Sequence, residues 1–239
     1  MTEQLCRADA YLRETQAKVL AVNERGGIVL DRTSFYAAAG GQPGDRGILH
    51  FDGSECPIAT TVYDADKTTI VHVAADGAAP PPAGATVRLV LDWASRHAYM
   101  RMHTAMHLLC SLVKFPVTGG QIGLGEGRID FDIEDASAVD KDKLTADLKA
   151  LIAADHAVTE RWITDAELDA NPGLVRTLSV QPPRGSGRIR LVMIGPDGAI
   201  DMQPCGGTHV RATAEIGAVA VAKIEKKGKI NRRIRLVFA

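Results

Sequence analysis

The sequence lacks any apolar run long enough to cross a membrane, and it lacks closely spaced cysteines. No window approaches the roughly 20 apolar residues that a membrane helix needs. The first residues, MTEQLCRADAYLRE, carry too much charge for a secretory signal peptide, so we expect a cytoplasmic protein that does not enter a membrane. The four cysteines form no C-x-x-C pair, which argues against a disulfide framework and against a zinc ribbon.

The sequence also lacks an internal repeat, a long low-complexity tract and a strong overall excess of either charge. Its 239 residues are 46% hydrophobic, which suffices for one large core or two modest ones in a globular protein. The net charge of −1 hides an asymmetry, because residues 223–235 hold seven Lys or Arg and one Glu, a local +6 that leaves −7 elsewhere. This distribution favours a polyanion bound at one face, although a solvated hairpin is an alternative explanation.

A break in composition divides the chain into two expected domains. Residues 74–86, AADGAAPPPAGAT, combine small residues with three consecutive prolines and cannot continue a helix or a central strand. Before this break, short alternating runs separated by glycine and aspartate predict hairpins: KVLAVNERGGIVLD, RGILHFDG and TTIVHVAADG. We therefore expect a small β-barrel over residues 1–92, with a sandwich as the alternative.

After residue 92 the hydrophobic period changes to that of a helix. Residues 93–115 predict a long helix that ends before Pro116, with Gly119-Gly120 as a turn beyond it. A second helix is expected to begin near Asp140. Residues 93–239 are thus expected to form an α+β domain with long helices and an antiparallel sheet. Its predicted strands are RIDFDI, RIRLVMIG, AVAVAKIE and INRRIRLVF, the last two paired as a hairpin.

Two pairs of candidate metal ligands stand out in the second domain. His103 and His107 are four residues apart on the predicted helix, so both imidazoles project from one face with Cβ atoms about 6 Å apart. Thr104 stands where the zinc helices of metalloproteases carry glutamate, which argues against a protease. Cys205 and His209 flank a Gly-Gly-Thr segment that suits a tight loop.

Together the two pairs supply three imidazoles and one thiolate, a ligand set typical of zinc. We predict one zinc ion held by His103, His107, Cys205 and His209. A distorted or partly open site leaves room for water or substrate, whereas a closed four-ligand site only holds the fold. Cys110 follows His107 by one turn, but its apolar neighbours indicate a buried small hydrophobe and not a fifth ligand.

Short motifs around these ligands and upstream of them are typical of one known family. They are RMHTAMHLL at 101–109, GGQIG at 119–123, RIDFD at 128–132, DMQPCGGTHV at 201–210, EIG at 215–217 and KGKINRRI at 227–234, with SFYAAAGGQPGDRG at 34–47. Together they resemble the editing domain of alanyl-tRNA synthetase and its free-standing relatives, the AlaX trans-editing proteins, here the medium-length class. The resemblance spans nearly the whole chain, and the order of its motifs is hard to obtain by chance.

The resemblance implies a hydrolase that deacylates mischarged alanine tRNA, chiefly seryl-tRNA(Ala) and to some extent glycyl-tRNA(Ala), and that binds zinc through the four ligands above. It implies that Gln121 contacts the substrate or water, because Gln121 matches a polar residue that lines the family's editing pocket. We expect catalytic roles for Gln121, Thr104 and His103. Thr104 and Thr118 are candidates to bind the serine hydroxyl. Many synthetases carry threonine just before the second histidine, where this chain has Met106, so the threonine that reads serine is left open.

The remaining expected binding residues lie in the glycine-rich segment and on the basic hairpin. G-G-Q at 40–42 also occurs in release factors, which we treat as a coincidence because double glycine most often marks a turn. The resemblance implies that Gly40, Gly41 and Gln42 face the tRNA end or the pocket. We expect lysines and arginines of the hairpin to hold tRNA phosphates: Lys226, Lys227, Lys229, Arg232 and Arg233.

An aminoacyl ester is already activated, so its hydrolysis needs a positioned water, a proton acceptor and stabilisation of the oxyanion. Zinc can activate the water, polarise the ester or hold the substrate, and the sequence does not choose among these. A pocket that reads the serine hydroxyl spares alanyl-tRNA, because alanine leaves its polar groups unpaired. Two alternatives are a zinc-stabilised RNA-binding module without catalysis and an editing domain of the threonyl-tRNA synthetase type. The sequence does not indicate an oligomeric state.

Overall fold

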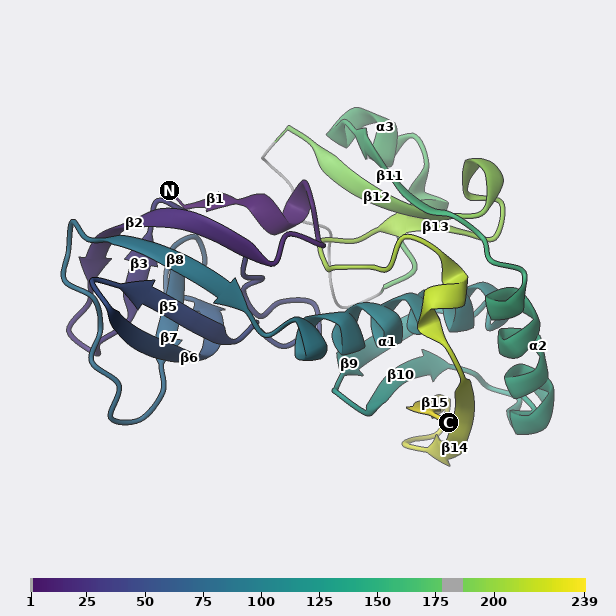
Figure 1. The fold of residues 1–239 in the computed structure, drawn as a ribbon. Helices are drawn as coiled ribbons and strands as arrows, with labels where there is room; N and C mark the ends of the chain where they lie inside the picture. The colour runs from purple at the N-terminus through teal and green to yellow at the C-terminus, as the bar shows by residue number, and fades with distance from the viewer. Residues whose placement is uncertain (1, 178–186) are drawn as a thin grey trace. The chain divides into compact units, whose positions relative to one another are not determined.

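The structure is a computed structural model that describes residues 2–177 and 187–239 (Figure 1). The chain divides into two compact units, Met1–His97 and Ala98–Ala239. Among the described residues, no helix is both long enough and apolar enough to cross a membrane. The assignment of residues 1–92 and 93–239 as two functional domains stays a prediction.

The first unit contains a closed antiparallel barrel with the strand order β2-β3-β7-β6-β5-β8. Positive φ angles at Asp52 and Gly53 form the tight turn between two of its strands. Alternate side chains such as Ile28, Leu30 and Leu49 point into the barrel and are fully buried. The barrel prediction is therefore confirmed over the sandwich. Its strands are β2 (Glu14–Val22), β3 (Ile28–Leu30), β5 (Gly47–Phe51), β6 (Ser54–Tyr63), β7 (Ile70–Ala74) and β8 (Thr86–Leu91), and a short parallel pair joins β1 (Glu3–Gln4) to β4 (Arg32–Thr33).

A buried ion pair fixes the glycine-rich segment 34–47 within this unit. Arg96 Nε donates to the two carboxylate oxygens of Asp45 at 2.9 and 3.0 Å, and the side chains are 0% and 1% exposed. The Arg96 guanidinium also donates to the backbone oxygens of Ala10 and Ser34, each at 2.8 Å. Because an unpaired buried charge is strongly destabilising, these contacts anchor the segment at Ser34 and Asp45.

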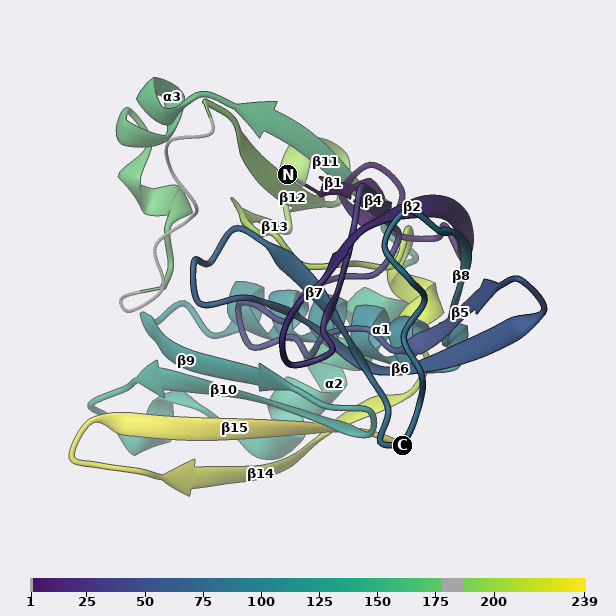
Figure 2. The ribbon, with the colours of Figure 1, turned by 90° about the vertical axis from the view of Figure 1, so that its left-hand side faces the viewer.

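In the second unit, a four-stranded antiparallel sheet has the order β14-β15-β10-β9 (Figure 2). Its inner face packs against α1 (Trp93–Leu112), where a Cβ at Gly127 would come within 2.9 Å of the sulfur atoms of Met102 and Met106. The predicted hairpin between the last two strands is confirmed. The strands are β9 (Val117–Ile122), β10 (Glu126–Asp132), β14 (Val219–Lys226) and β15 (Asn231–Phe238).

Two local predictions for the helix and the first strand of this unit differ from the structure. The long helix ends at Leu112 instead of residue 115, and Gly119-Gly120 lies inside β9 instead of in a turn. Both glycines are held in the strand by pairing with β10, where Gly119 stands opposite Asp130 and Gly120 opposite Ile129. The second helix, α2 (Lys141–Ala153), begins as expected with Asp140 as its N-cap.

A second antiparallel sheet has the order β11-β12-β13. One of its faces packs on α3 (Asp165–Asp169), where Ile163, Ile189 and Leu191 bury themselves against Leu168. The opposite face carries the residues that surround the expected metal ligands. Its strands are β11 (Val158–Ile163), β12 (Ile189–Ile194) and β13 (Asp201–Pro204).

Candidate metal centre

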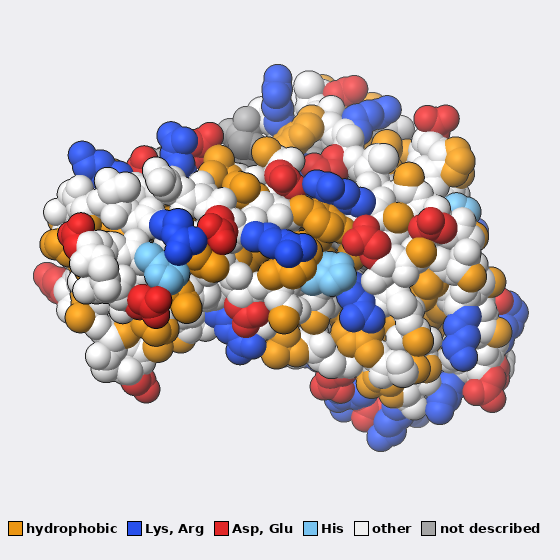
Figure 3. Space-filling view, viewed as in Figure 1, with side chains coloured by type: hydrophobic (Ala, Val, Ile, Leu, Met, Phe, Trp, Pro, Cys, Tyr) orange, Lys and Arg blue, Asp and Glu red, His pale blue; other side chains and the backbone are white. Residues whose placement is uncertain are grey.

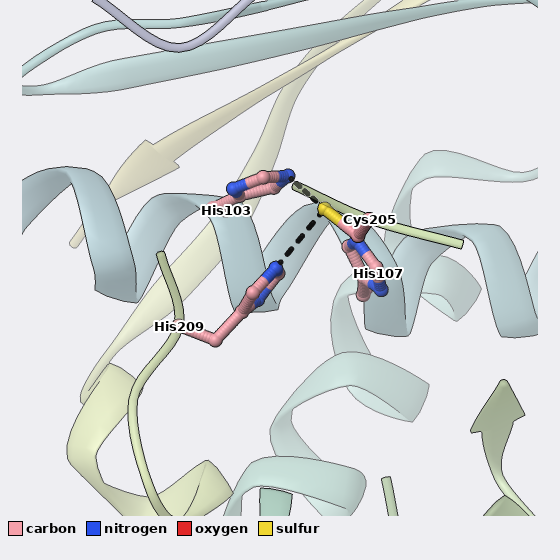
Figure 4. A group of neighbouring side chains, drawn as sticks. All are labelled: His103, His107, Cys205 and His209. Carbon is pink, nitrogen blue, oxygen red and sulfur yellow. Dashed lines mark hydrogen bonds between the residues drawn. The ribbon is translucent and has the colours of Figure 1, made fainter. Parts of the chain in front are cut away.

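The four expected metal ligands converge in the second unit (Figure 4). His103 and His107 project from one face of α1, and Cys205 and His209 come from the loop that follows β13. Their ligand atoms all lie within 4.8 Å of one another. The three histidines are 5–8% exposed, so the group is shielded from bulk water.

The distances within this group fit a tetrahedral zinc ion. Cys205 Sγ lies 3.5 Å from His103 Nε2 and 3.3 Å from His209 Nε2. Bonds of about 2.0 Å to nitrogen and 2.3 Å to sulfur at tetrahedral angles separate such atoms by about 3.5 Å. The donor set and its spacing therefore match a metal that prefers imidazole and thiolate.

A carboxylate orients the second ligand of the helix. His107 Nδ1 donates to Asp201 Oδ2 at 2.9 Å, and the Gln203 side-chain amide donates to the same oxygen at 2.8 Å. Arg176 stands 3.8 Å from the other oxygen of Asp201. With its proton fixed on Nδ1, the His107 ring presents the lone pair of Nε2 to the metal position.

A threonine orients the ligand of the loop in the same way. His209 Nδ1 donates to Thr104 Oγ1 at 3.1 Å, which leaves Nε2 for the metal. The Thr104 hydroxyl donates to the Met100 carbonyl oxygen at 2.9 Å and accepts from the Val210 N–H at 3.3 Å. The fully buried Thr104 thus supports His209 from the side of the ring that faces away from the metal position.

The electrostatic environment favours a thiolate. Burial by itself raises the pKa of Cys205, but the neighbouring His103 and His209 hold it well below its ordinary value. Burial and the nearby His103 lower the pKa of His209, so this ring stays neutral. Burial opposes the charge on His107, yet its hydrogen bonds to Asp201 and Cys205 raise its pKa to about 9. Thiolate and neutral imidazole are the forms that bind metals, so His107 would have to release its second proton when a metal binds.

The loop that carries Cys205 is held by a buried arginine on β12. The Arg190 guanidinium donates to the backbone oxygens of Cys205 and Gly207 at 3.0 and 2.7 Å, and it forms an ion pair with Glu160. The Gly207 N–H donates to Cys205 Sγ at 3.4 Å. Cys110 is 6% exposed and burial raises its thiol pKa to about 12, in agreement with a buried hydrophobe.

Two further expected site residues lie on β9 of the neighbouring sheet. Gln121 is exposed and stands opposite Arg128, whose Nε donates to the Gln121 side-chain oxygen at 3.1 Å. Thr118 Oγ1 donates to the Asp130 carbonyl oxygen at 3.2 Å and accepts from the Asn231 amide at 2.7 Å. Their roles toward a substrate stay predictions.

Met106 packs toward the sheet. It is 6% exposed and meets Gly120 and Gly127 of β9 and β10. The side chain therefore belongs to the core between helix and sheet, because it lies on the sheet-facing side of α1.

The glycine-rich segment forms a two-residue turn. Gly40 and Gly41 have φ angles of 58° and 84°, and backbone hydrogen bonds of 2.9 and 3.2 Å close the turn between Ala39 and Gln42. Gly40 and Gly41 are exposed, whereas Gln42 is 2% exposed. A contact with RNA at this turn would therefore involve the glycine backbone.

Several basic side chains of the hairpin are buried or paired with acidic residues, which its sequence does not indicate. Arg232 is 7% exposed, and Arg233 forms two hydrogen bonds of 2.7 and 2.8 Å with Asp130. Lys227 lies 4.0 Å from Glu225 and its side chain is 40% exposed. In the space-filling view, basic and acidic side chains lie side by side in the region that the hairpin occupies in Figure 1 (Figure 3). Phosphate binding by these residues stays a prediction.

Apart from Thr104, the residues that support the ligands were not identified from the sequence. Asp201 and Gln203 alternate along β13, so a strand through D-M-Q-P places both on one face, just before Cys205. That alternation was a usable signal for Asp201 and Gln203. For Arg190 there was none, since its partners are backbone oxygens 15 and 17 residues away.

Two family models match parts of the chain. The one described as the threonyl and alanyl tRNA synthetase second additional domain matches residues 189–235, and the one for class II (A) tRNA synthetases matches residues 6–95.

Curated relatives match nearly the whole chain. The alanyl-tRNA editing protein AlaX-M of Methanosarcina acetivorans is 36% identical over 98% of both chains. AlaX-L of Pyrococcus horikoshii is 31% identical over 96% of this chain and 56% of its own length. The alanine–tRNA ligase of Pyrobaculum neutrophilum is 35% identical over 94% of this chain and 25% of its own length.

Proposed function

Because this chain belongs to the family of AlaX-M alanyl-tRNA editing proteins, we propose that it is a zinc-dependent deacylase of mischarged alanine tRNA. Seryl-tRNA(Ala) is the main proposed substrate and glycyl-tRNA(Ala) the second. The observation that carries the proposal is the convergence of three imidazoles and one thiolate at zinc spacing. The expected compartment is the cytoplasm, where tRNA is charged.

The residues of the chain prepare the site for this chemistry. A bound zinc would supply a Lewis acid that polarises the ester or holds a polar group of the substrate. Asp201 and Thr104 fix the tautomers of His107 and His209, and Arg190 fixes the loop that carries Cys205. These supports hold the ligands in a preorganised geometry, so little reorganisation is needed when substrate binds.

The hydrogen bonds divide the candidate polar residues into two groups. The hydroxyl of Thr104 is used by Met100, Val210 and His209, so we propose that Thr104 positions a ligand and does not read serine. Gln121 and Thr118 remain the proposed contacts to the substrate. The exposed turn at Gly40 and Gly41 and the exposed lysines of the hairpin are proposed to contact tRNA.

Deacylation of seryl-, glycyl- and alanyl-tRNA(Ala) by the purified protein tests this proposal. We expect hydrolysis of the first two and little of the third, with loss of activity after chelation and recovery with zinc. Cys205→Ala should lose zinc and fall to the uncatalysed rate. Cys110→Ala removes a neighbouring buried thiol that is not a ligand, and it should retain zinc and activity.

Two outcomes would contradict the proposal. Tight tRNA binding by a zinc-loaded protein without hydrolysis of any ester would favour an RNA-binding module in which the metal only holds the fold. Preferential hydrolysis of seryl-tRNA(Thr) over seryl-tRNA(Ala) would favour an editing domain of the threonyl-tRNA synthetase type.

A further inference from the structure

Trp162 on β11 is a large apolar side chain that remains 44% exposed. The next residue, Ile163, is 2% exposed and packs with Leu168 and Ile189 on the α3 side of the sheet. Since successive side chains of a strand point to opposite faces, Trp162 projects from the other face. A single exposed tryptophan needs no explanation by itself, so its importance depends on what else lies on that face.

Trp162 lies in the same row of the sheet as a metal ligand. It stands directly opposite Arg190 on β12. The Arg190 carbonyl oxygen accepts a hydrogen bond of 3.1 Å from the Cys205 N–H, immediately beyond the paired residues Leu191 and Pro204. Because neighbouring strands lie about 4.8 Å apart, the Cα atoms of Trp162 and Cys205 are about 10 Å apart.

The contacts of β13 show that this face is the one that meets the metal centre. Gln203 pairs with Val192 and Asp201 with Ile194, and these two residues of β12 alternate with Arg190, the partner of Trp162, on one face. Asp201 accepts a hydrogen bond of 2.9 Å from His107, and it also accepts one of 2.8 Å from Gln203. The face that carries Trp162 therefore also carries the groups that orient a ligand.

The contacts of β11 lead to the same conclusion. Glu160, two residues before Trp162, forms an ion pair with Arg190. The guanidinium of Arg190 in turn holds the backbone oxygens of Cys205 and Gly207. An exposed indole thus stands beside the arginine that supports the metal-binding loop.

We propose that Trp162 is a stacking platform for the terminal adenine of the tRNA acceptor end. This inference rests on the proposed function. The ester is attached to the ribose of the terminal adenosine, so an ester placed at the metal centre brings that adenine within one nucleoside of it. An aromatic side chain two strands from Cys205 lies at a suitable distance, and stacking on an indole binds a base through its face.

Fluorescence of Trp162 tests the contact without requiring hydrolysis. The chain has two tryptophans, so Trp93→Phe leaves Trp162 as the only one. The probes are uncharged tRNA(Ala) with an intact end and the same tRNA lacking its terminal adenosine. We expect the intact tRNA to quench the emission of Trp162 and the shortened tRNA to leave it unchanged.

Kinetics of seryl-tRNA(Ala) deacylation test the contribution of the ring. Trp162→Ala should raise KM by about 10- to 100-fold with a smaller change in kcat, and Trp162→Phe should recover part of the loss. Thr159→Ala, an exposed residue on the opposite face of the same strand, serves as the control and should resemble the wild type. Zinc content should be unchanged in all three variants.

Equal quenching by both tRNAs, or no quenching by either, would overturn the proposal. A wild-type KM for Trp162→Ala would also overturn the proposal. This holds even if the variant has lost a protein partner or a dimer, because the exposed ring would then serve a protein contact. Failure of the wild type to deacylate seryl-tRNA(Ala) would instead reject the proposed function. The two failures can be told apart, because the fluorescence experiment uses uncharged tRNA and does not depend on hydrolysis.

Discussion

At the residue scale, two of the buried histidine ligands are oriented by a hydrogen bond at Nδ1, the ring nitrogen that faces away from the metal position. Asp201 serves His107, and Thr104 serves His209. These partners differ in charge. The Asp201 carboxylate therefore stabilises positive charge on the His107 ring, whereas the Thr104 hydroxyl only fixes the orientation of the His209 ring. The ligand with the neutral partner depends more strongly on geometry, since no ion pair holds it.

We therefore expect Thr104→Val to lower zinc affinity by about 10- to 100-fold, the usual effect of losing a group that supports a metal ligand. The change keeps the volume of the side chain but leaves His209 Nδ1 without its acceptor. Competition with a chelator measures the affinity. Thr104→Ser retains the hydroxyl and should bind zinc like the wild type, and an equal affinity for Thr104→Val would contradict the positioning role.

The sequence predicts the ligands but not most of their supports. Spacing of i and i+4 on a helix, and a loop short enough to turn on two glycines, determine where His103, His107, Cys205 and His209 point. The partners of Arg190 are backbone oxygens brought close by tertiary folding, which no local pattern encodes. In the same way, the sequence does not indicate that Arg232 is buried.

At the scale of elements, the alternating strands and the capped helix are predictable, whereas a strand with two adjacent glycines is not. Asp140 and the spacing of Leu144 and Leu148 place α2 correctly, because cap and burial pattern agree. The strand β9 was missed because Gly119-Gly120 has the composition of a turn. Pairing with Ile129 and Asp130 of β10 outweighs that local preference.

The barrel contains a histidine that makes its stability depend on pH. His72 on β7 is fully buried, its Nδ1 donates to the Ile28 carbonyl oxygen at 3.2 Å, and Thr33 donates to its Nε2 at 2.8 Å. Burial lowers its pKa from 6.5 to about 4. Between these values the unfolded chain binds a proton that the folded barrel does not.

Stability should therefore be fully present above pH 6.5 and decrease as the pH falls toward 4, by up to about 3 kcal/mol. Urea unfolding between pH 7 and 4 measures this loss. His72→Gln removes the titrating ring and should flatten the pH dependence. His50→Gln changes a histidine of β5 in the same barrel and controls for the substitution itself. An unaltered slope in His72→Gln would contradict the assignment.

At the scale of the whole molecule, a metal would connect α1 to the loop after β13. Binding to the folded state alone stabilises it, by about 4 kcal/mol when free zinc exceeds its dissociation constant 1,000-fold. We expect chelation to lower the Tm by roughly 10 °C. Cys205→Ala should show no such shift. A wild-type protein that loses its zinc without a change in Tm would show that the metal does not support the fold.

The separation of the ligands along the chain also has a consequence for biosynthesis. His103 and Cys205 are 102 residues apart, and two histidines alone form only half of the site. A ribosome makes that half first and must add the strands from β9 to β13 before the other half exists. Binding of a metal by all four residues therefore requires synthesis through His209, and a nascent chain that stops earlier lacks half of the proposed site.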